Sequence, residues 1–194
     1  MAQPDEGDVS GRHGDPIPAT VPDGAETHTR VIVDRITLAS GRAFDDVLAD
    51  VYTGISRPDL AAEMHEWAAA PSYADYTRKV REASGPAGLM RFLHLDLDTA
   101  LREDPDITPY RLVRIIAGNP VTMSRMTRHV PDAGAYAPVT ILLWQDADTV
   151  RIAYDTVASL ITPYGDPRAL AVARELDAEV LDLLRRAAAG PAPA

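Results

Sequence analysis

The residues best suited to chemistry lie in one short segment, where His94, Asp96 and Asp98 alternate with apolar residues. If residues 89–97 form a strand that continues to position 98, a period of two places these three side chains on one face of a sheet. Alternate side chains are then roughly 6.6 Å apart, too far for direct pairing but within reach of a shared ligand or a zinc ion. His94 and Asp96 would serve as a general acid–base pair or as two metal ligands. The simpler alternative is a polar sheet end, with Asp98 capping the helical turn that follows.

Asn119 is a candidate ligand for an anion because it stands between an expected strand, 110–117, and an expected helix, 120–129. Free N–H groups at a helix N-terminus bind carboxylates and phosphates, and the Asn119 amide would add a donor. The simpler role of Asn119 is the N-cap of that helix. Arg114 offers a cation for the same anion, although pairing with one of the many acidic residues is its plainer use.

Two methionines and a histidine, Met123, Met126 and His129, are spaced three residues apart and would share one side of a helix. Thioethers with an imidazole suit Cu(I). The simpler alternative is that methionine fills gaps in the core while His129 interacts with the helix C-terminus.

Aromatic residues gather in two expected helices, 57–69 and 71–85, at Trp67, Tyr73 and Tyr76. Trp67 and Tyr76 would line an apolar ligand pocket between these helices and the sheet. The alternative is that they anchor the helices to the core, because aromatic side chains dominate such packing.

Signatures of known catalytic centres are missing from the sequence. It contains no G-x-S-x-G, no H-E-x-x-H and no P-loop. It has no cysteine, which excludes disulfides, thiolate metal sites and a cysteine nucleophile. We therefore assign no cofactor and no metal site, and the sequence leaves open whether the protein is an enzyme.

Hydrophobic periodicity predicts the elements that position these residues. Strands are expected over 28–38, 89–97, 110–117, 138–145 and 150–154, and further helices over 42–53, 156–161 and 167–188. Strands and helices interleave, but the last two strands form a hairpin. We expect a single α+β domain: a mixed sheet of about five strands with helices on one face, plus a helical insertion over 57–85. Within 89–97, alternation places Phe92 on the face of His94, and Leu93 and Leu95 on the other.

The net charge of −10 is unevenly distributed along the chain. Residues 1–26 carry six acidic residues and one arginine, and we expect them to be a disordered tail before a domain over 27–189. Residues 190–194 form a second short tail. The acidity argues against nucleic-acid binding, and no apolar run is long enough to span a membrane. We expect a cytoplasmic location, and the excess of arginine over lysine fits a GC-rich, bacterial coding sequence.

Three segments resemble the domain of unknown function 302 family: LVRIIAGNP at 112–120, PDAG at 131–134 and WQDADTVRIAYD at 144–155. The resemblance extends over about 29–56 and 86–188. It implies a compact α+β domain that forms homodimers in some members, and the family's biochemical function is unassigned. Many members carry an Ile-Asp-His triplet at the end of the second strand, where this chain has Leu95-Asp96-Leu97.

Two functions follow as hypotheses. The first is a domain that binds a small apolar or anionic ligand, or that acts as a homodimeric interaction module. The second is a cofactor-independent or metal-assisted enzyme on a small metabolite, in which His94 and Asp96 exchange protons and Asn119 or Arg114 orients an anionic group. The second hypothesis predicts that His94 and Asp96 share a concave pocket.

Overall fold

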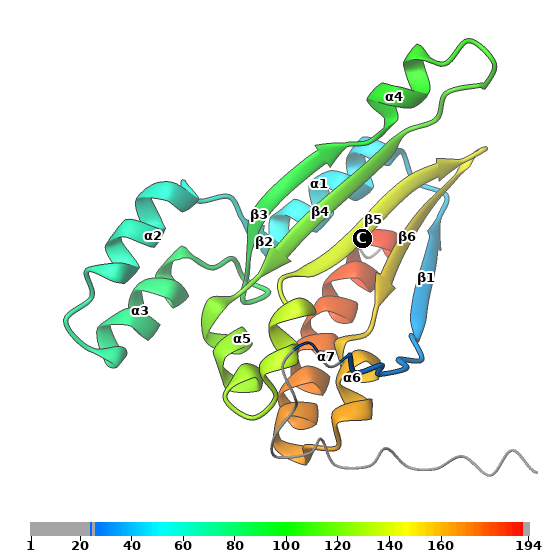
Figure 1. The fold of residues 1–194 in the computed structure, drawn as a ribbon. Helices are drawn as coiled ribbons and strands as arrows, with labels where there is room; N and C mark the ends of the chain where they lie inside the picture. Colours follow the sequence, from blue (N-terminus) through cyan, green and yellow to red (C-terminus); the bar gives the residue numbers. More distant parts are fainter. Residues whose placement is uncertain (1–23, 25, 192–194) are drawn as a thin grey trace, which may run out of the picture. The chain divides into compact units, whose positions relative to one another are not determined.

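Six strands form one mixed sheet in the order β1-β6-β5-β4-β3-β2 (Figure 1). They are β1 (Arg35–Ser40), β2 (Ile55–Ser56), β3 (Leu89–Asp96), β4 (Leu112–Gly118), β5 (Val139–Asp146) and β6 (Thr149–Asp155). All neighbours pair antiparallel except β2, which runs parallel to β3. The sheet comes from a computed structural model that describes Gly24 and residues 26–191. Most of the two expected tails, 1–26 and 190–194, therefore lies outside the described residues.

The α-helices are α1 (Phe44–Gly54), α2 (Leu60–Ala68), α3 (Tyr73–Ala83), α4 (Asp98–Glu103), α5 (Pro120–Thr127), α6 (Val157–Ile161) and α7 (Pro167–Ala189). Two 3₁₀ segments, η1 (Pro131–Ala135) and η2 (Thr162–Tyr164), follow α5 and α6. None of the helices in the described part of the chain is long and apolar enough to cross a membrane. By its contacts, Val31–Ala194 is one unit distinct from Met1–Arg30.

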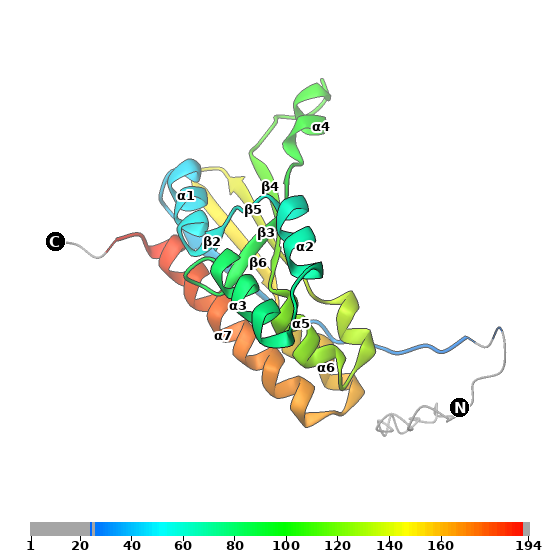
Figure 2. The same ribbon diagram turned by 90° about the vertical axis from the view of Figure 1, so that its left-hand side faces the viewer.

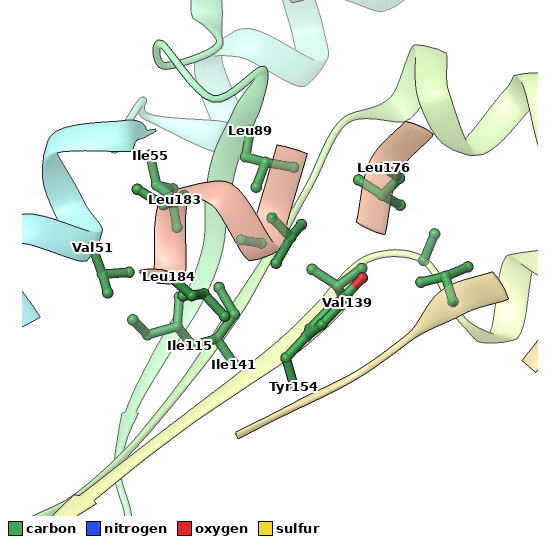
Figure 3. Packing of buried hydrophobic residues seen from close by; sticks show 14 of the residues in the cluster. Val51, Ile55, Leu89, Ile115, Val139, Ile141, Tyr154, Leu176, Leu183 and Leu184 are labelled. Atoms are coloured by element: carbon green, nitrogen blue, oxygen red, sulfur yellow. The ribbon is translucent and has the colours of Figure 1, made fainter. Parts of the chain in front are cut away.

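The main core lies between the sheet and α7, with α1 and α5 packed beside α7 (Figures 1 and 2). Figure 3 shows side chains of β4, β5 and β6 (Ile115, Ile141 and Tyr154) meeting Leu176, Leu183 and Leu184 of α7. Burial of these apolar side chains is the main force that holds the helices on this face. The expected α+β fold, with a mixed sheet and a helical insertion, is confirmed, and the short strand β2 brings the sheet to six strands.

The first strand begins later than expected, at Arg35 instead of position 28. It pairs with β6 from Arg35↔Asp155 to Ser40↔Val150, and β6 ends at Asp155, where the chain turns toward α6. The residues before Arg35 favour a strand by composition, but β6 does not extend far enough to pair with them.

Helices α2 and α3 form a hairpin that projects from the β2–β3 edge of the sheet (Figure 1). Trp67 and Val80 from these helices and Met90 from β3 form a second, smaller core. Side chains of α2, α3, β3 and α5 pack against it: Leu60, Tyr76, Ala83, Phe92 and Val121. The hairpin is therefore docked through its aromatic residues, which helps a segment too short to hold a core of its own.

Replacing Gly85 with alanine should lower the free energy of unfolding by about 2 kcal/mol, as overpacking does. A Cβ there would lie 2.5 Å from Gly54 O, at the end of α1, and 2.5 Å from Ser56 N in β2, and these backbone atoms cannot rotate away. Gly41→Ala is the matched control, because a Cβ at position 41 meets nothing within 4 Å. Urea unfolding of both variants checks this prediction, and equal stabilities would contradict it.

Candidate functional site around Tyr52 and His94

An irregularity in β3 decides which of its side chains face the helices. Arg91 pairs with Ala117 of β4 and His94 pairs with Ile115, both partners being buried core residues, and the register shifts between Arg91 and Leu93. A β-bulge inserts one extra residue, so residues on either side of it that are three apart can share a face. Arg91 and His94 therefore both lie on the helix-covered face, toward α1.

Phe92 is the residue affected by this shift, and its expected position was wrong. Its ring lies 3.3 Å from the place of a Cβ on Gly118, and it packs with Met90 and Trp67 on the side away from His94. His94 and Asp96 do share a face, as alternation predicted, because their β4 partners Ile115 and Val113 are both core residues. Asp98 does not lie on this face of the sheet, because the strand ends at Asp96.

A hydrogen-bonded chain connects α1 with β3 through His94. Tyr52, in the last turn of α1, places its hydroxyl against His94 Nδ1, and His94 Nε2 lies 3.0 Å from Asp96 Oδ1. The expectation that His94 and Asp96 stand too far apart for direct pairing was therefore wrong. The two side chains lean toward each other, so the backbone spacing of a strand overstates the distance between their polar atoms.

Asp96 sets the tautomer of the neutral His94 imidazole, because a carboxylate can only accept a hydrogen bond. Burial raises the pKa of the Tyr52 phenol above its ordinary value, against the opposing effect of the Arg91 and Arg57 guanidinium groups. At neutral pH the phenol is thus protonated and donates to His94 Nδ1. The neutral imidazole then carries its proton on Nε2 and donates a hydrogen bond to Asp96 Oδ1. This arrangement suits a base or a positioned hydrogen-bond donor.

Two arginines converge on the same tyrosine. Arg57, just after β2, places its Cζ 5.2 Å from the centroid of the Tyr52 ring, and the Cζ of Arg91 lies 5.9 Å away. Neither guanidinium forms an ion pair with a carboxylate of the described residues, whereas nearby Arg111 pairs with Asp45 at 3.0 Å. Stacking leaves the N–H donors of Arg57 unused, and Arg91, which also acts as a donor to the Tyr52 hydroxyl, has further N–H groups. Both arginines therefore keep donors for a ligand.

A surface hollow of about 440 Å³ lies at this cluster. Its lining comes from α1, β3 and the residue after β2: Tyr52, Arg57, Arg91, Phe92, Leu93 and His94. Its size falls within the range of small-molecule sites. The enzyme hypothesis predicted that His94 and Asp96 share a concave pocket. His94 lines this hollow, whereas Asp96 does not and has 60% of its side chain exposed.

The sequence matches the model of the family described as "Domain of unknown function DUF302" over residues 65–187. The chain belongs to the DUF302 family. The match starts inside α2, so it includes Arg91, His94 and Asp96 and omits Tyr52 and Arg57.

A solved structure similar to this DUF302 chain is the crystal structure of an uncharacterized conserved DUF302 protein from Bacillus stearothermophilus. The two share 12% sequence identity with a TM-score of 0.55, over 78% of this chain and 96% of the other. At this identity the likeness shows the fold. Among curated proteins, none matches the sequence.

Asn119 is built into the scaffold of the DUF302 fold. Its Oδ1 accepts from the Val121 and Thr122 N–H groups and caps α5, while its Nδ2 donates to Gly88 O at 2.9 Å and to Ser84 Oγ. All the polar atoms of the amide are therefore engaged within the protein, the simpler role considered from the sequence. A second hollow, of about 370 Å³, nevertheless includes Asn119 in its lining.

Arg114 lies on the opposite face of the sheet from His94. It pairs in register with Leu95 and Leu142, and its guanidinium donates to Thr140 Oγ1 at 3.3 Å. The structure therefore does not bring Arg114 together with His94 and Asp96 in one pocket, although it is exposed and lines another hollow.

The aromatic candidates of the hairpin belong to its packing. Trp67 is buried at 6% exposure in the smaller core, and Tyr76 is half-buried against it. Tyr73 is exposed and stacks on Tyr76, with ring centroids 6.2 Å apart. The contacts of Trp67 and Tyr76 are thus those of anchors.

The methionine–histidine cluster does not form on one helix. Met126 is fully buried in the main core, while α5 ends at Thr127, before His129. No three histidine, aspartate or glutamate side chains within the described ranges are arranged to hold a metal ion. These methionines fill the core, as their flexible side chains suit.

Tyr52, Arg57 and Arg91 are site residues that the sequence analysis did not single out. Tyr52 follows Leu48 at i+4 on α1, so the helical pattern alone presents it as a core residue. Arg57 and Arg91 stand 34 positions apart in the sequence, and both come to Tyr52 because β2 pairs with the start of β3 at Ile55↔Leu89. The sequence signal for this cluster was one arginine just after β2 and another near the start of β3. This signal is weak, because arginine is almost the only basic residue of the chain.

Proposed function

We propose that this DUF302 domain binds a small anion, a phosphate or a carboxylate of a metabolite, in the hollow beside Tyr52. One observation carries the proposal: two guanidinium groups, Arg57 and Arg91, lie against the same tyrosine and are free of carboxylate partners among the described residues. The chain is rich in acidic residues, and several arginines of the fold, among them Arg35, Arg42 and Arg111, pair with them. Other arginines of the described residues also lack an ion pair, so what distinguishes Arg57 and Arg91 is that both lie against one tyrosine ring and line one hollow.

The geometry suits an oxyanion. Guanidinium groups bind planar carboxylates and phosphates through paired N–H donors. Phe92 and Leu93 also line the hollow, although the Phe92 ring itself packs on the other side of β3. The His94–Tyr52 hydrogen bond holds the phenol in place, which helps to preorganise the site.

A thermal-shift titration tests this function. Inorganic phosphate, pyrophosphate and citrate, added at constant ionic strength, should raise the unfolding temperature, whereas potassium chloride should not. At ten times the dissociation constant, the expected stabilisation is about 1.4 kcal/mol. If none of these anions stabilises the protein more than chloride does, the proposal fails.

The second candidate function is an enzyme that acts on a metabolite at the same site. Its basis is the hydrogen-bonded chain Asp96–His94–Tyr52, because an imidazole held by two such partners can transfer a proton as a general acid or base. The arginines would hold an anionic substrate while the imidazole exchanges a proton. A panel of phosphate monoesters and simple esters tests it. Any turnover should fall about 10²–10⁴-fold in His94→Gln while anion affinity stays within about twofold. Turnover that survives this substitution would exclude His94 as the acid–base group.

The homodimer implied by the family resemblance and a cytoplasmic location are further parts of the proposal. Sedimentation velocity over a range of protein concentrations tests the dimer, which a single monomeric species at all concentrations would contradict.

A further inference from the structure

The face of the sheet opposite α1, α5 and α7 carries a mainly apolar row of side chains that crosses four strands. Arg114 of β4 pairs in register with Leu95 of β3 and with Leu142 of β5. Leu142 in turn pairs with Ala153 of β6. Residues directly opposite on neighbouring strands project to the same face. The row therefore presents a single cation between apolar side chains.

This face is hollowed beside the ion pair between Arg35 and Asp155, which lines the hollow together with the row. A depression of about 380 Å³ lies over Ala153, with Arg114, Thr140 and Leu142 among its lining. Leu97, which follows β3 and is 38% exposed, adds a further apolar wall. The volume is at the lower end of the range for small-molecule pockets.

Arg114 differs from Arg35 and Arg151 on the same face, because these two arginines have carboxylate partners. Arg35 donates two hydrogen bonds to Asp155, at 2.6 and 2.8 Å, and Arg151 lies 3.2 Å from Asp146. Arg114 forms no ion pair with the residues that the structure describes and touches only a hydroxyl, Thr140 Oγ1. A guanidinium beside apolar surface, with no counter-ion, is complementary to an anion that carries an apolar group.

We propose that this depression is a second ligand site, which binds an anionic amphiphile: one carboxylate-like head and a short hydrocarbon tail. The head pairs with Arg114 and accepts from Thr140 Oγ1, while the tail lies on Leu142, Ala153 and Leu97. A small inorganic anion would leave these apolar contacts unused, and a neutral apolar ligand would leave Arg114 unused. The site is separate from the Tyr52 hollow, because Arg114 and His94 lie on opposite faces of the sheet.

Calorimetric titration of the full-length protein with octanoate tests this site, with acetate and octyltrimethylammonium as the probes that lack the tail and reverse the charge. Octanoate should bind at least tenfold more tightly than either. Arg114→Gln should weaken octanoate binding about tenfold, the effect of losing a charged hydrogen-bonding partner. Arg151→Gln is the matched control, since Arg151 lies on the same face but is already paired with Asp146, and it should change the affinity less than about twofold.

Four results would overturn the inference. The first is octanoate affinity that Arg114→Gln leaves unchanged, and the second is equal binding of octyltrimethylammonium. The third is a dimer that Leu142→Asp dissociates, because a second copy of the chain would then cover this face. The fourth is that octanoate does not bind at all. If phosphate still binds, and Arg57→Ala with Arg91→Ala abolishes that binding, this site alone is overturned and the proposed function stands.

Discussion

Replacing Asp177 with alanine should lower the free energy of unfolding by about 3 kcal/mol, the largest single effect on stability that we expect. Asp177 lies on α7 with 6% of its surface exposed. Its carboxylate accepts from the Tyr154 hydroxyl at 2.6 Å and from the backbone N–H groups of Val157 and Ala158 at 2.8 and 2.9 Å. Alanine would leave two buried donors and one part-buried donor without an acceptor, and each such loss is costly.

The position of Asp177 explains why one residue has this effect. Its partners lie at the end of β6 and in the first turn of α6, so one carboxylate joins three elements across the core. Burial, together with the neighbouring Asp177 charge, raises the pKa of Tyr154 far above its ordinary value, which keeps the phenol a donor. The tyrosine therefore stays bonded to Asp177 throughout the neutral range.

Asp182→Ala provides the matched control on the same helix. Asp182 pairs with Arg186 at the surface, where both side chains are 62% exposed, and such pairs contribute about 0.3–0.5 kcal/mol. Guanidinium chloride unfolding of both variants measures the difference. A loss in Asp177→Ala no larger than that in Asp182→Ala would contradict the account of this carboxylate.

Replacing both Arg57 and Arg91 with alanine should weaken phosphate binding about 100-fold, the largest effect on function that we expect. Each guanidinium supplies a charge-assisted contact, and the loss of one corresponds to about tenfold in affinity. Each single variant should therefore weaken binding about tenfold. Isothermal titration of the wild type, both single variants and the double variant measures these steps.

A second double variant separates this site from the overall charge of the protein. Arg174 and Arg185 lie exposed on α7, and neither forms an ion pair within the part of the chain that the structure describes. Arg174→Ala with Arg185→Ala removes the same two charges at a different place and should leave affinity within about threefold. Equal weakening by the two double variants would show that phosphate responds to net charge and not to the Tyr52 hollow.

The fold could be predicted from the sequence largely because most of its elements follow simple periods. In α7 the stripe of Val172, Leu176, Val180 and Leu183 predicted the buried face, and Asp166 caps the helix through the Arg168 and Ala169 N–H groups as expected for this residue type. The strand β1 was harder to bound, because its length depends on where β6 ends. Strand β2 has only two residues and shows no pattern of its own.

The candidate site was only half predictable, because its geometry arises from tertiary contacts. Alternation identified His94 and Asp96 as neighbours on one face, whereas the bulge that turns Arg91 toward the same face left no mark in the sequence. Tyr52 reads as part of an amphipathic helix, and only the packing of α1 beside β3 brings its hydroxyl to His94. Arg114 has the chemistry expected of an anion ligand but lies on the other face of the sheet, which pattern alone could not determine.

The position of a bound anion tests the central claim most directly. Crystals of the wild-type protein soaked with tungstate, an analogue of phosphate with strong anomalous scattering, would show where the anion binds. The account predicts an anomalous peak within hydrogen-bonding distance of the Arg57 and Arg91 guanidinium groups, beside the Tyr52 hydroxyl. A peak at other arginines only, with the Tyr52 hollow empty, would contradict it.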